Sequence, residues 1–533
     1  MTQEVQILIP IILIITIIIL ILIFRKKIFI FFVKLIHLFK DIFRGIKNGI
    51  IGNKDVIIFL KNHPNIHKFL KQRFDKNNIY GYKLTKIILF FVFASFLFTK
   101  VIQNYVAQKI LIQSDIRISN LIFYFRDIDV FNFFTLITNF GNPIIITIFT
   151  TLFIIYSFLL KKKKYIIPML SSIFFATFSN IIIKNIFERP RPDVSFYIEH
   201  GFSFPSGYST IAVAFYGFIS YFLIRNIKNR KKKFAIIFFS TTLIFIIGFS
   251  RIYLGSNYLS DVIGGFLLGA MCLSLSVFIS EILINKKEDH HLSFNKEIKR
   301  ITYAIFFIAL TFLISFTIFH KQNINVIQNN TNQIKIESLD NISNEFDKNS
   351  LTKYSEMLSG KSQQPMSFII VAKNDEEILN FFEKAGWSQA RYPDLKSLAK
   401  VAKSAILNKE DETAPMTPSF WNAQIHNFGF QKSTSEKTAR KRHHARFWKT
   451  NMITNDGKIV YIGTASFDIG IKWGITHTID PDIDTEREFL FNDLNKTGLI
   501  KDYKKEKFVK PVLGKNFAGD FFFTNGEAYI IEI

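Results

Sequence analysis

The chain has 533 residues, a net charge of +25, and a composition that is 49% hydrophobic with 62 phenylalanines. A mean hydropathy of +0.21 together with long apolar runs excludes a purely cytosolic enzyme, a disordered protein and a disulfide-rich secreted module. The single cysteine, Cys272, excludes a disulfide framework and a cysteine metal cluster.

Eight apolar stretches are long enough, or nearly so, to cross the ~30 Å hydrocarbon core of a bilayer as helices. They lie at residues 5–24, 86–102, 143–160, 165–183, 208–224, 234–250, 261–284 and 301–319. The run at 28–39 is short and contains Lys34 and His37, which favours an amphipathic helix on the membrane surface. The sequence therefore predicts an all-α polytopic membrane helical bundle of about eight segments.

The positive charge is concentrated in the membranous part. The first 320 residues contain 38 basic and 15 acidic residues, whereas the rest contain 29 and 27. The basic loops alternate along the chain with less basic ones; they lie at 25–83, 161–164, 225–233 and 285–300. Basic loops stay cytoplasmic, so this alternation places the other loops and everything after His320 on the outer side. It also argues against nucleic acid as a partner.

Two further features bear on location and assembly. The polytopic plan and the bias toward Lys, Ile, Asn and Phe suggest a multi-pass protein of a bacterial inner membrane. Gly265 and Gly269 have the spacing that lets a second helix approach closely. We expect them to pack within the bundle rather than to form a dimer, and the oligomeric state stays open.

Three short motifs lie at the outer ends of predicted segments, at residues 184–192, 204–208 and 250–261. Arginine can grip a phosphate with two hydrogen bonds, lysine supplies a point charge, and a helix N-terminus offers N–H groups to an anion. The motifs therefore predict a phosphate-binding site. Its residues are Lys184, Arg191, Ser206, Gly207 and Arg251.

In their order and spacing these motifs resemble the signature of the type 2 phosphatidic acid phosphatase superfamily of membrane lipid phosphatases. That signature reads Lys-x6-Arg-Pro, then Pro-Ser-Gly-His, then Ser-Arg-x5-His-x3-Asp. The matching residues are Lys184, Arg191, Pro192, Pro205, Ser206, Gly207, Ser250, Arg251 and Asp261. The resemblance covers roughly residues 55–285, and it implies a helical bundle with a phosphate pocket at the membrane surface.

Both histidines of the family signature are replaced here. Asn257 stands where the family has the nucleophilic histidine, which forms a phosphohistidine. Tyr208 stands where the family has the histidine that acts as general acid. Asp261, which in the family orients the nucleophile, then faces an amide. An amide nitrogen has no lone pair for attack, and a tyrosine of pKa ~10 is poorly matched to neutral pH. His200 in the same outer loop is a possible substitute base.

The C-terminal part reads as soluble. Residues 321–365 are rich in Asn, Gln, Ser and Lys, which predicts a polar linker that is partly disordered. Residues 366–533 predict an α+β domain. Its expected elements are strands at 367–371, 445–449 and 459–467, helices at 374–384 and 394–407, and a hairpin at 520–533 that turns at Asn525-Gly526.

One acidic stretch in this domain allows two interpretations. An extended strand would place its carboxylates on one face, where they could bind Ca²⁺ or Mg²⁺. A capping box of Thr485 and Glu488 at a helix start would explain the same composition without a metal. The carboxylates are Asp480, Asp482, Asp484 and Glu486.

This region also resembles the LssY-type C-terminal domain, which is found fused to such phosphatase-like membrane domains. The matching runs are Ala385-Gly-Trp387, Thr417-Pro418, Phe420-Trp421, 465–470 and 479–484. The domain plan is thus an anchor and amphipathic segment at 1–54, a phosphatase-like membrane domain at 55–320, a linker at 321–365 and an LssY-type domain at 366–533.

The sequence thus predicts a lipid phosphatase-like membrane protein. Its phosphate-binding pocket at the outer membrane face is expected to take a lipid phosphate or diphosphate headgroup. No cofactor is expected to be required. Its partners are expected to be membrane lipids with phosphate headgroups. Hydrolysis is one possible outcome. The alternative is a catalytically inactive headgroup-binding sensor or scaffold that presents the C-terminal domain.

Overall fold

The structure is a computed structural model, and it describes residues 34, 41, 45, 48–49, 52–75, 81–107, 110–196, 199–284, 296–319, 333–336, 342–391, 413–434, 441–472, 476–516 and 519–533. The chain divides into two compact units. The first combines residues 1–106 with 128–326, and the second combines 107–127 with 327–533. The second unit therefore includes a short piece of chain taken from between two helices of the first.

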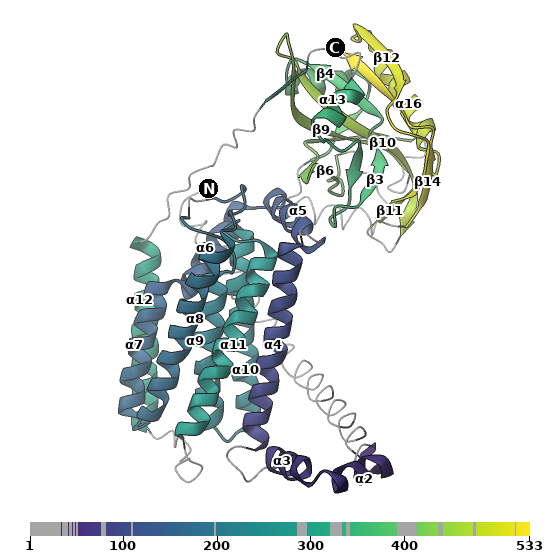
Figure 1. Cartoon of the computed structure of the whole chain (residues 1–533). Coiled ribbons are helices and arrows are strands. Elements are labelled where there is room, and N and C mark those ends of the chain that lie inside the picture. Colours follow the sequence, from purple (N-terminus) through teal and green to yellow (C-terminus); the bar gives the residue numbers. More distant parts are fainter. Residues whose placement is uncertain are drawn as a thin grey trace. The chain divides into compact units, whose positions relative to one another are not determined.

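The first unit is a bundle of long helices that run side by side (Figure 1). Five of the described helices are long and apolar enough to cross a membrane: α4 (Tyr82–Val106), α8 (Ile166–Phe187), α9 (Gly207–Asn226), α10 (Arg230–Tyr253) and α11 (Leu259–Leu283). Helix α12 (Lys296–Phe319) packs beside α7 (Pro143–Leu159), and α2 (Lys54–Asn62) and α3 (Pro64–Phe74) precede the bundle.

A bent pair of helices gives a sixth span if its two members are counted together. Helix α6 (Ile128–Thr138) and the short η1 (Asn139–Gly141) meet α7 at an angle of 50°. The break follows from the sequence, because Pro143 has no N–H for the preceding turn and Asn142 caps α7 by accepting the N–H of Ile144 at 2.9 Å.

The bundle is confirmed, with five to six spans among the described residues where the sequence predicted about eight. The predicted segments at 86–102, 165–183, 208–224, 234–250 and 261–284 fall on the five long helices, and 143–160 matches α7. The anchor at 5–24 lies outside the described residues, as does the amphipathic run at 28–39 apart from Lys34.

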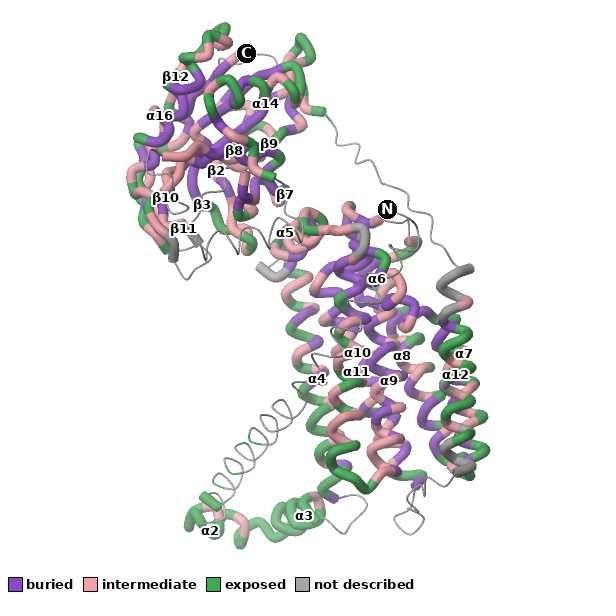
Figure 2. Tube along the Cα trace, turned by 180° about the vertical axis from the view of Figure 1, so that it is seen from behind, coloured by how far each residue is buried: buried purple, intermediate pink, exposed green. Residues whose placement is uncertain are grey.

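The outward faces of the bundle are apolar. On α4, Leu89, Phe93 and Phe96 each leave more than half of their surface exposed, and Figure 2 shows exposed residues along the outer helices with buried ones toward the interior. Aqueous solvent would make such a continuous apolar surface unfavourable, whereas lipid tails accept it.

The close approach of α11 to α9 depends on two glycines. A Cβ added at Gly265 would lie 2.6 Å from the carbonyl oxygen of Ser206, and one at Gly269 would lie 2.5 Å from that of Thr210. These contacts confirm the prediction that the glycine spacing serves packing within the chain. They also place α11 directly against the start of α9.

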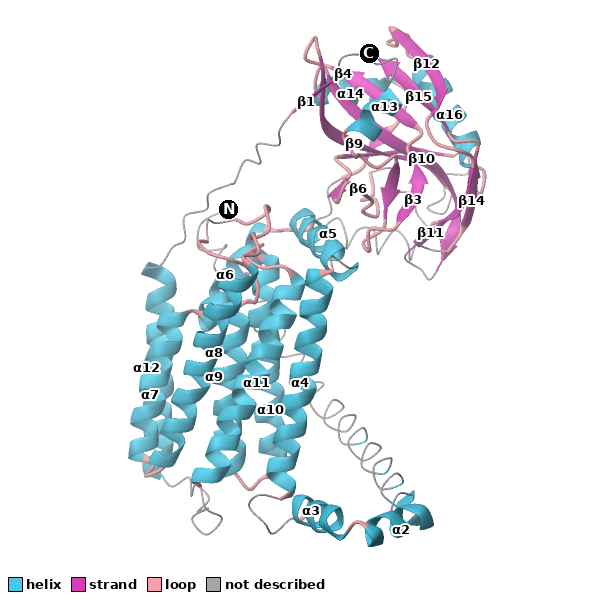
Figure 3. Ribbon diagram, in the orientation of Figure 1, coloured by secondary structure: helices cyan, strands magenta, loops and turns pink. Residues whose placement is uncertain are grey.

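The second unit is built on a twisted nine-stranded sheet (Figure 3). The order is β12 (Asp502–Lys507), β15 (Glu527–Glu532), β4 (Phe368–Ala372), β10 (Ile459–Lys472), β9 (Arg442–Thr454), β8 (Phe428–Ser433) and β5 (Ser388–Gln389). Strand β1 (Ile334–Ile336) lies beside β9, and β11 (Thr476–Ile479) beside β10. β15–β4 and β1–β9 are parallel, and the other pairs are antiparallel.

Both faces of this sheet are covered, which explains the unbroken apolar run of β4. Phe368 and Ile370 pack against α14 (Asp375–Lys384) and α16 (Ile483–Asn495), whereas Ile369 and Val371 belong to the core on the other face. A strand buried on both faces has no polar side to alternate with. The other elements are α13 (Ile342–Lys348), the four-stranded sheet β3 (Ser362–Pro365), β2 (Tyr354–Glu356), β6 (Phe420–Trp421) and β7 (Gln424–Ile425), and the pair β13 (Val512–Lys515) and β14 (Phe521–Thr524).

Helix α5 (Ile110–Tyr124) belongs to this second unit although it lies between α4 and α6 in the chain. Arg117 forms an ion pair with Glu356 at 2.8 Å, and the Asn120 amide donates to the carbonyl oxygen of Ala423 at 2.7 Å. The same Glu356 carboxylate accepts the N–H of Ala423, so one partly buried acid fixes both α5 and the β6–β7 turn.

The predicted α+β domain is confirmed, with two corrections. Residues 334–336 and 342–365, predicted as part of a linker, contribute β1, α13, β2 and β3 to the folded unit. The predicted hairpin at 520–533 is wrong, because β14 pairs with β13 while β15 pairs with β12 and β4. The helix predicted at 394–407 lies outside the described residues.

A first prediction concerns the α9–α11 contact. We expect Gly265→Ala to destabilise the bundle by about 1–3 kcal/mol, because its Cβ meets backbone that cannot rotate away. The single thiol, on buried Cys272 of α11, makes a thiol-reactive dye in detergent a specific reporter of bundle unfolding. Gly217→Ala is the matched control, since its Cβ would meet only the flexible side chain of Leu273. Equal melting temperatures for the two variants would contradict this assignment.

A second prediction concerns acid and the second unit. Burial, and after it the charge of Arg446, lowers the pKa of His426 to about 3. The unfolded chain then binds more protons than the folded one between pH 6.5 and 3, so stability falls as the pH falls through that window. From pH 7 to 5 we expect a loss of roughly 2 kcal/mol from this group.

All four tryptophans lie in the second unit's sequence, so tryptophan fluorescence of the full chain during urea unfolding measures this loss. His426→Gln should have a shallower pH dependence than the native protein. The exposed His200 provides the control His200→Gln, which should keep the native slope. An unchanged slope in His426→Gln would refute the assignment.

Candidate functional site

Three chain segments meet at one end of the bundle. They are the residues after α8, the start of α9 and the junction between α10 and α11. The N–H of Ser206 donates to the carbonyl oxygen of Asp261 at 3.0 Å, and that of Ser203 donates to the carbonyl oxygen of Arg189 at 2.8 Å. These backbone bonds join the three motifs that the sequence places far apart.

Lys184, Arg191 and Arg251 form a cation cluster at this junction. Arg251 is 1% exposed; its Nε donates to Asn257 Oδ1 at 3.2 Å and its Nη1 to Thr138 Oγ1 at 3.2 Å. The guanidinium also lies 4.0 Å from the centre of the Tyr208 ring. Contacts on three sides fix its orientation before any ligand arrives.

The other two cations are held by backbone oxygens. Arg191 donates from Nε to the carbonyl of Gly201 at 3.0 Å and from Nη1 to that of Ser256 at 2.7 Å. Lys184, in the last turn of α8, donates to the carbonyl of Phe202 at 2.7 Å.

A carboxylate lies between the arginines of the cation cluster. Glu199 forms ion pairs with both Arg251 and Arg191. Burial by itself would raise the pKa of Glu199, but the charges of Arg251, Arg191 and, more weakly, Lys184 outweigh it and hold that pKa below the ordinary value. Glu199 is therefore an anion bound where the cations converge.

Sequence reasoning did not find Glu199, because it lies outside the three motifs. The available signal was an acidic residue in the outer loop between two arginine motifs. The neighbouring His200, which the sequence suggested as a substitute base, is exposed. Of these two described residues, Glu199 is the one that pairs with the cation cluster.

The N-terminus of α9 completes the arrangement. Ser206 is its N-cap, and Gly207 and Tyr208 begin its first turn, whose N–H groups have no partner within the helix. The Ser206 hydroxyl donates to Asn257 Oδ1 at 3.3 Å. Gly207 lies against Asn180, whose Oδ1 would be 3.2 Å from an added Cβ. The five predicted phosphate-binding residues thus come together.

Asn257 and Tyr208, the two positions where the resemblance places histidines, serve as hydrogen-bonding groups. The Asn257 Oδ1 accepts from Arg251 and Ser206, while its Nδ2 donates to the carbonyl of Ser203 at 2.8 Å. The amide of Asn142 donates to the Tyr208 hydroxyl at 3.4 Å. An asparagine used in this way ties the Ser203 loop to Arg251 and offers no nucleophile.

Asp261 has a different partner from the one expected. Its Oδ1 accepts from Arg189 at 2.6 Å, and its Oδ2 accepts the N–H of Tyr258 at the start of α11. Arg189 is 4% exposed and lies near the faces of Tyr105 and Tyr258. Sequence reasoning missed Arg189, because the signature counts from Lys184 to Arg191 and passes over it.

The acidic stretch of the second unit does not form an extended row, because the segment becomes helical at Ile483. Asp480 accepts the N–H of Asp482 at 2.9 Å, and Asp482 is the N-cap of α16. The helix is therefore capped by Asp482, three residues before Thr485, the residue predicted to cap it. Glu486 pairs elsewhere, with His443 Nδ1 at 2.8 Å.

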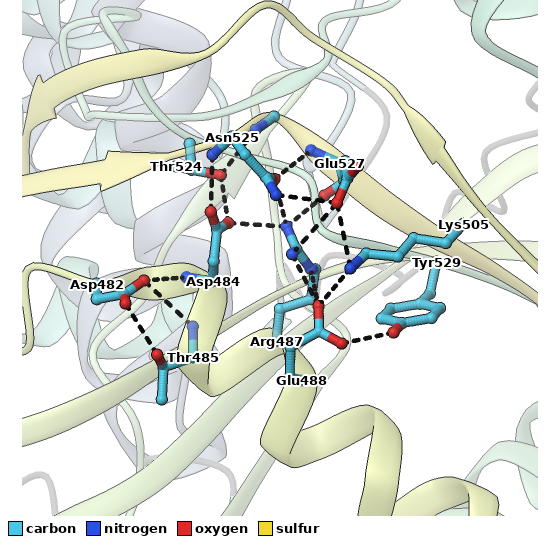
Figure 4. Close-up of polar contacts among 11 residues, drawn as sticks. Asp482, Asp484, Thr485, Arg487, Glu488, Lys505, Thr524, Asn525, Glu527 and Tyr529 are labelled. Carbon is cyan, nitrogen blue, oxygen red and sulfur yellow. Dashed lines mark hydrogen bonds and ion pairs between the residues drawn. The ribbon is translucent and has the colours of Figure 1, made fainter.

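Figure 4 shows how the remaining acids of this stretch are used. Arg487, 2% exposed, pairs with Asp484 at 2.7 Å and with Glu488 at 2.8 Å, and Glu488 also pairs with Lys505 at 2.8 Å. Within the described ranges, no group of three or more His, Cys, Asp or Glu side chains could hold a metal ion. These carboxylates instead attach α16 to neighbouring strands.

Comparison with known proteins finds similarity in both parts of the chain. Residues 165–285 match the model of the PAP2 superfamily, and residues 348–528 match that of the LssY C-terminus. Phosphatidylglycerophosphatase B of Bacillus subtilis (strain 168) is 38% identical over 98 residues, or 18% of this chain. The match spans 48%, about half, of that relative's length.

Two solved structures are also similar. The first transmembrane PAP2 type phosphatidylglycerolphosphate phosphatase from Bacillus subtilis has 28% identity and a TM-score of 0.33, covering 38% of this chain and 98% of that one. Aquifex aeolicus LpxE has 28% identity and a TM-score of 0.25, covering 30% and 92%. Two family models therefore match this chain, that of the PAP2 superfamily within its helical bundle and that of the LssY C-terminus within its second unit.

Proposed function

We propose that the cation cluster, with Ser206 and Gly207 at the start of α9, binds the phosphate headgroup of a membrane lipid. The observation that carries this proposal is Glu199, an anion already paired with both arginines of the cluster. A site that holds a carboxylate between two guanidinium groups has the charge and the donor geometry for a phosphate oxygen pair.

Burial supports a strong interaction at this site. Arg251 is 1% exposed and is oriented by Asn257, Thr138 and Tyr208, so an anion that reaches it meets a charge in a low-dielectric setting at little cost in side-chain entropy. Dipoles at the start of α9 favour the same anion.

We further propose that binding proceeds without a phosphohistidine, because Asn257 and Tyr208 replace the two histidines of the signature. The protein would then be a headgroup-binding sensor or scaffold that presents its C-terminal domain. Hydrolysis of a lipid phosphate is the second candidate, supported by the similarity to a phosphatidylglycerophosphatase. It would require a nucleophile other than Asn257, such as a water molecule activated by another residue.

The outer face of a bacterial inner membrane is the proposed location of the site. Helix α5 lies in the loop between α4 and α6, which the charge pattern assigns to the outer side, and it packs within the same unit as the C-terminal domain. A contact of this kind requires both segments to be on one side of the membrane. The proposal therefore places that domain on the outer side.

Binding and phosphate release test the proposal together. We expect the detergent-purified full chain to bind short-chain phosphatidic acid and to release no phosphate from it, from phosphatidylglycerol phosphate or from a polyprenyl diphosphate. Arg251→Ala should weaken binding roughly 10- to 100-fold, the effect of losing one or two charged hydrogen bonds. Arg230→Ala, at the exposed opposite end of the same helix, should bind normally.

A double variant separates lost chemistry from lost binding. Tyr208→His combined with Asn257→His should release phosphate, because it restores both groups of the signature to a cluster that still binds. Release by the native protein that disappears in Arg251→Ala would instead establish hydrolysis. Binding that is equal in the native protein and Arg251→Ala would refute the proposed site.

A further inference from the structure

One short segment satisfies all three members of the cation cluster. Glu199 pairs with Arg251 and Arg191, the carbonyl of Gly201 accepts from Arg191, and the carbonyl of Phe202 accepts from Lys184. Only His200 interrupts this run of residues, and the carbonyl oxygen of Ser203, which follows it, accepts from Asn257. The site therefore contains its own set of acceptors.

Glu199 is the charged member of that set. A carboxylate and a phosphate monoester both present oxygen pairs that match the guanidinium fork, so they compete for the same donors. The two anions cannot share the arginines, because like charges at contact distance in a poorly hydrated site repel strongly. The carbonyl oxygens of Gly201 and Phe202 carry no net charge, so a bound phosphate would not repel them as strongly as it repels the Glu199 carboxylate.

The carboxylate also explains how the cluster is stable without a ligand. Arg251 is almost completely buried, and a buried guanidinium without an anionic partner is costly. Glu199 neutralises part of this charge when the site holds no phosphate. A phosphate ligand must therefore displace Glu199 from its ion pairs, because the arginines already have an anionic partner.

Resting on the proposed function, we propose that Glu199 is a built-in competitor that occupies the phosphate position between Arg191 and Arg251 and must leave before a phosphate monoester binds. The apparent dissociation constant is then the intrinsic one divided by the fraction of molecules in which Glu199 has left. Removing the charge of Glu199 should tighten binding, although it removes contacts from the folded protein.

The test compares Glu199→Gln with the native full chain in detergent. The probes are short-chain phosphatidic acid and, as the second source of the same chemistry, inorganic phosphate. Calorimetric titration should show binding about tenfold tighter in Glu199→Gln for both probes, corresponding to ~1.4 kcal/mol for displacing the ion pairs. A larger gain for the lipid alone would assign the competition to the lipid rather than to its phosphate, and would overturn the proposal.

Glu188→Gln is the matched control, because Glu188 is exposed and belongs to the same outer loop. It should bind both probes like the native protein, which excludes a general effect of loop charge. Equal tightening in Glu188→Gln would overturn the proposal.

Unfolding gives an independent readout through the dye reaction of Cys272. Without ligand, Glu199→Gln should melt below the native protein, and added phosphatidic acid should raise its melting temperature by more than it raises the native one. If Glu199→Gln does not fold, Glu199→Asp keeps the charge with a shorter reach, and it should bind more tightly than the native protein but less than tenfold so.

The outcomes separate this inference from the function it rests on. Native binding with unchanged or weaker binding in the folded Glu199 variant refutes the competitor and leaves the phosphate site intact. Absence of binding in the native protein and in every Glu199 variant refutes the phosphate site and the competitor together. Binding that appears only after Glu199 is changed supports both.

Discussion

The buried guanidinium of Arg251 is the constraint on which the membrane site depends. A permanent charge at this position must be surrounded by acceptors, and they come from four separate parts of the chain: Thr138 before α7, Glu199 in the outer loop, Asn257 before α11 and the face of Tyr208 on α9. The requirement to satisfy one cation thereby brings α6, α9, α10 and α11 to a common point.

The small residues around this point follow from the same requirement. The carbonyl oxygen of Asp261 accepts the N–H of Ser206, which requires α11 to lie directly against the first turn of α9. Only glycine at position 265 leaves room for this close contact between the two helices. Packing and electrostatics are therefore not independent here. A change in helix spacing would move the donors that surround the charge.

Much of this arrangement could be predicted from the sequence, because short motifs carry their spacing with them. Lys184, Ser206 and Arg251 lie at helix ends whose positions hydropathy locates, and Arg191 lies in the loop directly after α8. Glu199 and Arg189 could not be found in this way. Their roles depend on how a loop folds back over the cluster, and neither periodicity nor spacing specifies the path of such a loop.

The errors in the second unit have the same origin. Asn525-Gly526 indicates a tight turn, but a turn does not determine which strands pair, and β14 and β15 find different neighbours. The acidic stretch was ambiguous between a strand and a helix start. Its outcome was decided by Arg487, a residue of opposite charge that binds Asp484 and Glu488 from within the helix. Asp484 and Glu488 also contact Thr524 and Lys505 outside the helix, and a local pattern does not specify such partners.

The position of α5 has a consequence for the integrity of the whole protein. This helix is covalently part of the chain between α4 and α6, yet its side chains are bonded into the C-terminal domain through Glu356 and Ala423. The second unit is thus joined to the membrane part by the chain on either side of α5 as well as by the chain after α12, while non-covalent contacts hold α5 to the rest of the second unit. Proteolysis between α12 and β1 would cut the chain after α12 and leave the contacts with α5, so the severed domain would remain bound as though it were a separate subunit.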